Sequence, residues 1–172
     1  MIDEKTHRVA GCLVNRDLLA FPPGFLDTYS DAANPLTPWC QFLWDLDAKA
    51  AKRIPLLQQQ QQRPDQKNVF VDLWMLGVHP DFRGQKLANH LVRASEIALR
   101  EAGCRFATIE AVSAFTTAAA LHNAFVPVAQ IEAKDWLWQG KPHYTNMEKP
   151  HGTWTFFLKD LQGGRTEDAI AN

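Results

Sequence analysis

The chain has 172 residues, a formal net charge of −1 and no long basic block. Its length suits a single domain with a substantial core, and its charge gives no reason to expect a nucleic-acid partner. No run of about 18 apolar residues and no charged start followed by an apolar stretch occurs, so we expect no membrane partner, no signal peptide and a cytoplasmic location. The three cysteines are odd in number and far apart, and the six histidines are scattered. This pattern favours reduced thiols and predicts no metal site.

The first half of the chain predicts a strand and a helix joined by loops. Residues 8–15 alternate loosely and indicate a strand, and a turn-rich loop follows at residues 22–24. Thr37 and Pro38 are residue types that suit a helix N-cap and a first helical position. One apolar helix face follows, made of Trp39, Phe42, Leu43, Leu46 and Ala50. Pro55 ends this helical region, and the glutamine run at residues 58–62 is expected to form a solvated loop.

The clearest pattern is a strand, a tight turn and a helix between residues 69 and 102. Residues 69–78 are an apolar strand, residues 79–84 a polar turn, and the helix begins at Gln85. Its apolar residues recur three and four apart, as on one buried helix face. Such a turn presents free backbone N–H groups at the positive end of a helix dipole, where a phosphate can bind. Arg83 and Lys86 add two cations at this place.

The second half predicts further strands around one short helix. We expect strands at residues 105–112, 125–133 and 151–158, and a helix at residues 113–122. Pro127 marks its strand as an edge strand or a bulged one. The predicted fold is a mixed α/β sandwich in one domain over residues 1–161, with a flexible tail at residues 162–172.

Residues 83–88, Arg-Gly-Gln-Lys-Leu-Ala, resemble the coenzyme A pyrophosphate loop of the GNAT N-acetyltransferases, which reads Arg/Gln-x-x-Gly-x-Gly/Ala. Arg83 and Ala88 fit the two ends of this pattern. Lys86 stands where the family has its middle glycine, a residue that takes positive φ freely and lets phosphate approach the backbone. Two outcomes are open: Lys86 brings a charge to the ligand, or it weakens the loop.

Within this superfamily the chain is most similar to the insect-type arylalkylamine N-acetyltransferase-like group. Residues 76–84, Leu-Gly-Val-His-Pro-Asp-Phe-Arg-Gly, resemble that group's central strand and turn, and the likeness extends over residues 8–161. It implies a GNAT-like mixed β-sheet flanked by helices. Members of the group have a strand and one or two helices before the strand at Arg8, including a glutamate that serves as base. We therefore expect an N-terminally shortened fold, from a truncated or alternatively started product.

The resemblance implies transfer of an acetyl group from acetyl-CoA to a small primary amine, with an arylalkylamine as one candidate. Such an amine has a pKa near 10 and must lose a proton before it attacks the thioester. The oxyanion that forms needs a hydrogen-bond donor. By resemblance, the cofactor-binding residues are Leu76, Gly77 and Val78 on the strand, and Arg83, Gly84, Gln85, Lys86, Leu87 and Ala88 in the loop. Gly77 has a simple bulge as its alternative role.

Asp72 is the candidate base. A carboxylate inside an apolar strand is costly to bury without a partner, and burial raises its pKa. Strand alternation predicts that Asp72, Trp74, Leu76 and Val78 share one side. The alternative is that Asp72 pairs with a basic neighbour.

Three further residues are catalytic candidates by resemblance. Thr116 falls on the second of two serines that the insect-type enzymes carry four residues apart. Val112 falls on the first, and Ser113 takes that place only if the local geometry slips by one residue. Helix capping is the alternative role of Ser113 and Thr116. His122 lies where many relatives use a tyrosine to protonate the CoA thiolate, with an ordinary surface position as its alternative. Trp136, Trp138 and Tyr144 either line an aromatic acceptor site or cap the core.

Three interpretations therefore remain open. The first is an N-acetyltransferase, and the second is a catalytically inactive GNAT-like module that binds CoA or a partner chain. The third is a generic α/β domain unrelated to CoA. Lys86 and the shortened N-terminus motivate the second. An open sheet edge can be covered by formation of a homodimer.

Overall fold

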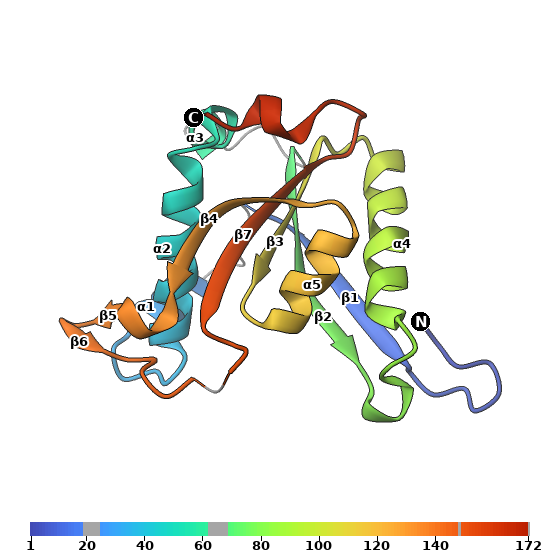
Figure 1. Cartoon of the computed structure of the whole chain (residues 1–172), viewed down its shortest axis with the longest axis horizontal. Helices are drawn as coiled ribbons and strands as arrows, with labels where there is room; N and C mark the ends of the chain where they lie inside the picture. The colour runs from blue at the N-terminus through green and yellow to red at the C-terminus, as the bar shows by residue number, and fades with distance from the viewer. Residues whose placement is uncertain (19–24, 62–68, 148, 172) are drawn as a thin grey trace.

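The computed structural model describes residues 1–18, 25–61, 69–147 and 149–171. Five strands form a mixed sheet in the order β1-β2-β3-β7-β4 (Figure 1). The strands are β1 (Gly11–Asp17), β2 (Phe70–Val78), β3 (Phe106–Ala111), β4 (Val126–Glu132) and β7 (Thr153–Asp160). β2 and β3 are parallel and their other neighbours are antiparallel. A small hairpin joins β5 (Leu137–Trp138) to β6 (Lys141–Pro142). The mixed sheet predicted from the sequence is confirmed.

Helices cover both faces of this sheet, as Figure 1 shows. α2 (Thr37–Ala51) and α3 (Pro55–Gln61) pack on one face, and α1 (Phe25–Ser30) contacts α2. α4 (Leu87–Glu101) and α5 (Ala114–His122) pack on the other face. Apolar side chains of the strands alternate between the two cores: Phe70 and Phe106 lie on the α2 face, and Val71 and Ala107 on the α4 face. No helix in the described ranges has the length and apolarity needed to cross a bilayer.

The helical region before β2 differs from the prediction in two places. Leu36, not Thr37, is the N-cap of α2, and the Thr37 hydroxyl donates to the Asp31 carbonyl. Pro55 begins α3 instead of ending the helical region, since proline is well tolerated in a first helical turn. The predicted loop at the glutamine run is wrong for residues 58–61, because Leu57 and Gln60 are buried and anchor the helix. Gln62 and the predicted turn at residues 22–24 lie outside the described residues.

The C-terminal segment was predicted to be a flexible tail, but its described residues lie against the body of the molecule. Thr166–Ala169 form a short 3-10 turn beside α3 (Figure 1). Thr166 is buried and its Oγ1 accepts from the Asp160 N–H at 3.0 Å. The Ala171 N–H donates to the Arg53 carbonyl at 2.7 Å. These are tertiary contacts, and neither leaves a local signal in a polar, glycine-containing sequence.

Candidate active site

The central feature of the sheet is that β2 and β3 pair over only a short stretch. Phe70, Val71 and Asp72 pair with Phe106–Thr108, and no further pairs join these strands. Both strands continue beyond this point, β2 to Val78 and β3 to Ala111, and Figure 1 shows them diverging. The edge of β2 that faces β3 is therefore left without a strand partner over its second half.

A bulge at Trp74 decides which backbone groups face this gap. On the β1 side, Val14 pairs with Met75 and Asn15 pairs with Leu73, so Trp74 is the extra residue. Beyond the bulge, the His79 N–H donates to the Ala10 carbonyl at 2.9 Å. Backbone groups alternate in direction along a strand, so Gly77 also faces β1. Leu76 and Val78 consequently direct their N–H and C=O groups into the gap.

The same bulge reverses the side chains of β2. Asp72 and Trp74 lie on the α2 face, where Arg16 contacts both. Leu76 packs against the core cluster on the α4 face, and Val78 lies beside Gly11 on that face, next to Leu91. The prediction that these four β2 side chains share one side is therefore wrong, because simple alternation holds only in an unbroken strand.

The turn after β2 has the conformation that a phosphate-binding loop needs. Gly84 has φ 78° and Lys86 has φ 59°, and Lys86 is the N-cap of α4. In the described part of the chain the backbone N–H groups of residues 84–88 have no hydrogen-bond acceptor. A β-carbon placed on Gly84 would meet no atom within 4 Å, and the Lys86 side chain is exposed. Lys86 thus has the positive φ for which the family pattern uses a glycine. Its side chain does not fill the space in front of Gly84.

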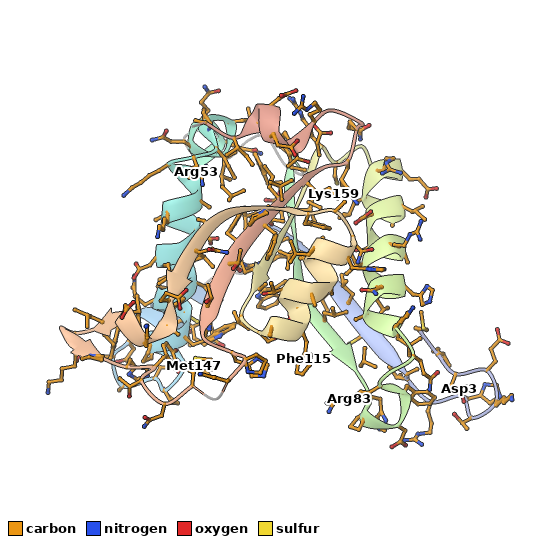
Figure 2. All side chains as sticks on the ribbon, viewed as in Figure 1. Asp3, Arg53, Arg83, Phe115, Met147 and Lys159 are labelled. Atoms are coloured by element: carbon orange, nitrogen blue, oxygen red, sulfur yellow. The ribbon has the colours of Figure 1, made fainter. Side chains whose placement is uncertain are left out.

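Neighbouring residues hold this turn in place. The His79 ring accepts from the Asp81 N–H at 3.2 Å, and Arg8 pairs with the Asp81 carboxylate at 2.9 Å. Arg8 thereby offsets the negative charge closest in sequence to the loop. Arg83, which Figure 2 shows at this turn, and Lys86 are exposed cations.

On the α2 face, Arg16 connects the two strands where they separate. Its Nε donates to Asp72 Oδ2 at 3.2 Å, and its Nη2 donates to Glu110 Oε2 at 3.3 Å. Thr108 donates to the other oxygen of Asp72 at 3.3 Å. The guanidinium lies 4.9 Å from the centre of the Trp74 ring. An arginine from β1 therefore reaches across β2 to β3 at the apex of the gap.

Three carboxyl groups lie close enough to Arg16 for its charge to lower their pKa values. Burial has the larger, opposite effect on each of them. Burial raises the pKa of Asp72 to about 6, although Arg16 opposes the shift. Burial also raises the pKa of Asp47 on α2 to about 7. The pKa of Glu110 is raised well above its usual value by burial and by the charges of Asp47 and Asp72. Asp72 is buried and pairs with a basic neighbour, which is the alternative role that the sequence analysis gave it.

The sequence did not single out Arg16, Asp47 or Glu110. Glu110 carried a usable signal, since it is a carboxylate inside the buried strand at residues 105–112, as Asp72 is in its own strand. Asp47 follows Leu46 in the predicted helix, and the apolar periodicity of that helix gives no sign that an acidic residue is buried. Arg16 lies one residue beyond the strand that was predicted for residues 8–15.

The other catalytic candidates lie on α5, which packs on the α4 face. Ser113 caps α5: its Oγ accepts from the Thr116 N–H at 3.1 Å and lies 3.0 Å from the Thr116 hydroxyl. His122 is exposed at the end of α5, where Asn123 approaches Asn89 of the first turn of α4 at 3.5 Å. The structure thus brings Ser113 and Thr116 together and places His122 near the start of α4, whereas Asp72 lies on the opposite face.

The aromatic residues of the long loop pack against the core. Trp136 stacks on Tyr144 with 5.7 Å between ring centres and lies 5.0 Å from Phe42. Its indole N–H donates to Asp45 at 2.7 Å. Trp138 stacks on Trp136 at 6.2 Å. These contacts favour the core-capping role for this group.

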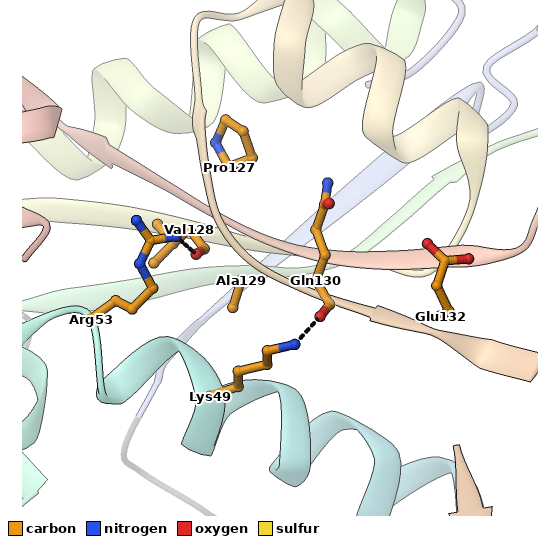
Figure 3. A pocket seen from close by; sticks show the side chains of 7 residues that line it. All are labelled: Lys49, Arg53, Pro127, Val128, Ala129, Gln130 and Glu132. Atoms are coloured by element: carbon orange, nitrogen blue, oxygen red, sulfur yellow. Dashed lines mark hydrogen bonds between the residues drawn. The ribbon is translucent and has the colours of Figure 1, made fainter. Parts of the chain in front are cut away.

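A hollow of about 510 Å³ lies along the free edge of β4 (Figure 3). Its two cations are engaged: Lys49 Nζ donates to the Gln130 carbonyl at 2.6 Å, and Arg53 Nη1 to the Val128 carbonyl at 2.7 Å. Pro127 and a register shift beside it confirm the predicted irregular edge strand. These features protect a sheet edge, so we do not assign a catalytic site to this hollow.

The described residues contain no group of three or more His, Cys, Asp or Glu side chains that could hold a metal ion.

Comparisons with known proteins agree with this architecture. Residues 21–125, more than half of the chain, match the family model described as the acetyltransferase (GNAT) family. No curated protein sequence matches the chain.

Three solved structures illustrate the similarity of fold. Arylalkylamine N-acetyltransferase 2 from Aedes aegypti has a TM-score of 0.74 at 19% identity, over 93% of this chain and 71% of that one. The C-terminal condensation domain of Ebony, in complex with beta-alanyl-dopamine, has a TM-score of 0.71 at 15% identity, over 92% and 70% of the two chains. The polyamine N-acetyltransferase of Drosophila melanogaster has a TM-score of 0.66 at 15% identity, over 90% and 70%. With its divided sheet, its left-handed loop before α4 and the family match, the chain belongs to the GNAT acetyltransferase family.

Proposed function

We propose that the protein is an acetyl-CoA-dependent N-acetyltransferase that acts on a small primary amine. The observation that carries this proposal is the direction of the backbone of β2. Leu76 and Val78 present their peptide groups to an unpaired gap, and residues 84–88 lie where β2 leaves that gap. An extended pantetheine arm can pair with these groups as an added strand.

The loop supplies the anchor for the cofactor. The free N–H groups of residues 84–88 bind the pyrophosphate at the positive end of α4, and Arg83 and Lys86 add charge. Each charge-assisted hydrogen bond contributes about 1.5–3 kcal/mol. The arm then runs along Leu76, Gly77 and Val78 and brings the thioester toward Trp74.

The reaction needs an oxyanion donor, a proton acceptor and a proton donor. We assign the oxyanion to a gap-facing backbone N–H of β2 at Leu76. We assign the amine's proton to the carboxyl cluster that contains Asp72, on the α2 face. Ser113, Thr116 and His122, on the α4 face, are our candidates for protonating the CoA thiolate.

We infer that the acceptor is an arylalkylamine. Trp39, Trp44 and Trp74 surround the outer side of the carboxyl cluster, and indole faces attract both aromatic rings and cations. The Aedes aegypti neighbour is named for arylalkylamines, and the Ebony domain was solved with beta-alanyl-dopamine. A panel of arylalkylamines and polyamines, assayed by thiol release from acetyl-CoA, tests this assignment.

A matched pair of glycine variants tests the cofactor site. Gly84 and Gly103 both have φ 78°, and a β-carbon at either meets no atom within 4 Å. Gly84→Ala and Gly103→Ala should therefore cost similar stability, about 1–2 kcal/mol each. Only Gly84→Ala should weaken acetyl-CoA binding, by tenfold or more in calorimetry, because its methyl group occupies the phosphate's approach. Equal affinity in both variants would refute the loop assignment.

A non-catalytic CoA-binding module is the second candidate. One observation favours it: the cavity lined by Asp47 and the three tryptophans has a volume of only about 10 Å³, too small for an amine in this conformation. In that case acetyl-CoA would raise the melting temperature, yet no amine in the panel would release free thiol.

A further inference from the structure

Two buried carboxyl oxygens in the cluster receive no hydrogen bond from any donor group among the described residues. They are Asp47 Oδ1 and Glu110 Oε1. Asp47 and Glu110 are close enough for a side-chain hydrogen bond between them to shift the pKa of each carboxyl group. An ionised carboxylate can only accept, so two of them bond to each other only when one keeps a proton. Because the Glu110 side chain is 5% exposed, water has little access to that side of the pair.

Asp47 is the member of the carboxyl cluster that lines a cavity. It lines the small cavity together with Arg16, Trp39, Trp44 and Trp74, whereas Asp72 is completely buried. The cavity volume of about 10 Å³ suits a single water molecule, for which Arg16 and Asp47 supply a donor and an acceptor. A proton can therefore enter the cluster at Asp47.

The groups that face Asp47 come from each neighbouring element. They are Arg16 on β1, Asp72 on β2, Glu110 on β3 and Cys40 on α2 itself. Arg16 carries the positive charge and lowers the pKa of Asp47, while Asp72 and burial raise it. Burial raises the pKa of the Cys40 thiol, so this group stays neutral. The result is a carboxyl pair that can gain a proton near neutral pH.

We propose that Asp47, paired with Glu110, takes the proton from the acceptor amine through one water molecule in the tryptophan-lined cavity. This inference rests on the proposed N-acetyltransferase function and names the catalytic base within it. Asp72 has a different part, since its two oxygens are occupied by Arg16 and Thr108. It holds Arg16 in position, and is a positioning residue.

The proton balance of the step is complete. The ammonium group gives one proton to the Asp47 carboxylate, and the neutral amine forms a bond to the thioester carbon. The carbon–sulfur bond breaks, and the second proton leaves the nitrogen and ends on the thiolate, giving the amide and CoA thiol. Asp47 then releases its proton to solvent through the cavity.

The first test is the pH profile of amine acetylation by Asp47→Asn, with tryptamine as acceptor. A positioned base contributes about 10²–10⁴-fold, so kcat/KM should fall by at least 100-fold. The inflection near pH 7 should disappear, leaving only the rise set by the amine, whose pKa lies near 10. Asp45→Asn is the matched control on the same helix, because Asp45 bonds to Gln41 and Trp136 and, among the described residues, to no member of the cluster. It should keep the inflection and most of the rate.

The second test uses Glu110→Met, which removes the hydrogen bond that lowers the pKa of Asp47. The Asp47 inflection should move to higher pH, whereas Glu110→Gln, which keeps a neutral donor toward Asp47, should leave the inflection in place. Infrared spectroscopy of the unliganded protein supplies a readout without turnover: at pH 6 the wild type should show a protonated carboxyl band that Asp47→Asn alters.

The outcomes separate this inference from the proposed function. If the wild type acetylates tryptamine and Asp47→Asn keeps its rate and pH profile, the base assignment is overturned and the acetyltransferase stands. If the wild type binds acetyl-CoA but acetylates no amine, the proposed function fails and the base assignment fails with it. Absence of a protonated carboxyl band at pH 6 overturns the shared proton directly.

Discussion

Lys86 shows how a single residue can depart from a family pattern and keep its geometry. Its φ of 59° costs a side-chain-bearing residue about 1–2 kcal/mol. The helix that begins at the next residue buries Leu91, Val92 and Leu99, and this burial outweighs the local strain. The structure therefore retains the left-handed turn and gains an exposed cation.

We predict that Lys86→Met weakens acetyl-CoA binding several-fold and flattens its dependence on salt, because one phosphate-facing charge is lost. Calorimetry at low and high salt measures both effects. Lys52→Met removes an equally exposed charge from the end of α2 and should change neither. A Lys86→Met protein with the wild-type salt dependence would show that this side chain does not reach the phosphates.

A second residue-scale prediction concerns Arg16, the cation that faces three buried carboxyl groups in the described part of the chain. Arg16→Met should destabilise the protein by about 3–5 kcal/mol at pH 8, because Asp72 is left as an uncompensated buried charge. The loss should be smaller at pH 5, where the carboxyl groups are protonated. Arg8→Met removes a pair whose side chains are 50% and 58% exposed, and should cost under about 1 kcal/mol. Chemical denaturation of Arg16→Met at pH 5 and pH 8 measures the loss of stability. An equal loss at the two pH values would contradict this prediction.

At the scale of elements, β2 behaves as two half-strands with different neighbours. Its first half is paired on both sides, and its second half is paired with β1 alone. We predict that the amides of Leu76 and Val78 exchange with deuterium much faster than those of Gly77 and His79. Addition of acetyl-CoA should slow exchange at Leu76 and Val78 selectively. NMR-detected exchange checks this, and uniform protection along the strand would contradict the assigned backbone directions.

The free edge of β4 is a second element with its own prediction. Lys49 and Arg53 occupy two of its carbonyl groups. Removing both in Lys49→Ala/Arg53→Ala should expose the edge and promote self-association at high concentration, which analytical ultracentrifugation detects. Lys52→Ala, on the same helix end, is the control. Unchanged association would mean that Pro127 and the register shift protect the edge sufficiently.

The sequence allowed prediction of the elements with strong periodicity, namely β2, α4, β3 and β7, and of the loop between β2 and α4. It could not reveal the bulge at Trp74, because an extra residue leaves the composition of an apolar strand unchanged. The Asp47–Glu110 pair is also invisible locally, since its residues are far apart in the chain and meet only through packing of α2 on the sheet. α3 was missed because glutamines were interpreted by their polarity rather than by their helix propensity.

At the scale of the whole molecule, the carboxyl cluster links stability to pH. The pKa values of Asp47 and Asp72 are raised from 3.8 to about 7 and about 6, and that of Glu110 is also raised. Between about pH 4 and pH 7 the folded protein therefore binds more protons than the unfolded chain, and its stability falls as pH rises. Each unit of elevation corresponds to about 1.4 kcal/mol.

We predict that urea unfolding gives a higher stability at pH 5 than at pH 8, by a few kcal/mol. The double variant Asp47→Asn/Glu110→Gln should lose most of this difference, because it removes two of the three groups that titrate differently in the folded state. A stability that rises steadily from pH 5 to pH 8 in the wild type would contradict the raised pKa values.

The two faces of the sheet divide the proposed reaction between them. The α4 face carries the exposed cations, the left-handed loop and the end of α5, and it suits an anionic cofactor. The α2 face carries Arg16, the carboxyl cluster and the three indoles, and it suits a cationic acceptor. The gap between β2 and β3 connects these faces, so cofactor and acceptor can approach from opposite sides.

The extra residue at Trp74 has a consequence for how this protein tolerates insertions and deletions. Deleting Trp74 would make the pairing of β2 with β1 regular, because Leu73 and Met75 already pair with the adjacent residues Asn15 and Val14. The peptide groups from Met75 onward would keep their directions, so Leu76 and Val78 would still face the gap. A shortening by one residue at this position should thus preserve cofactor binding and remove only the indole ring that lies over Arg16.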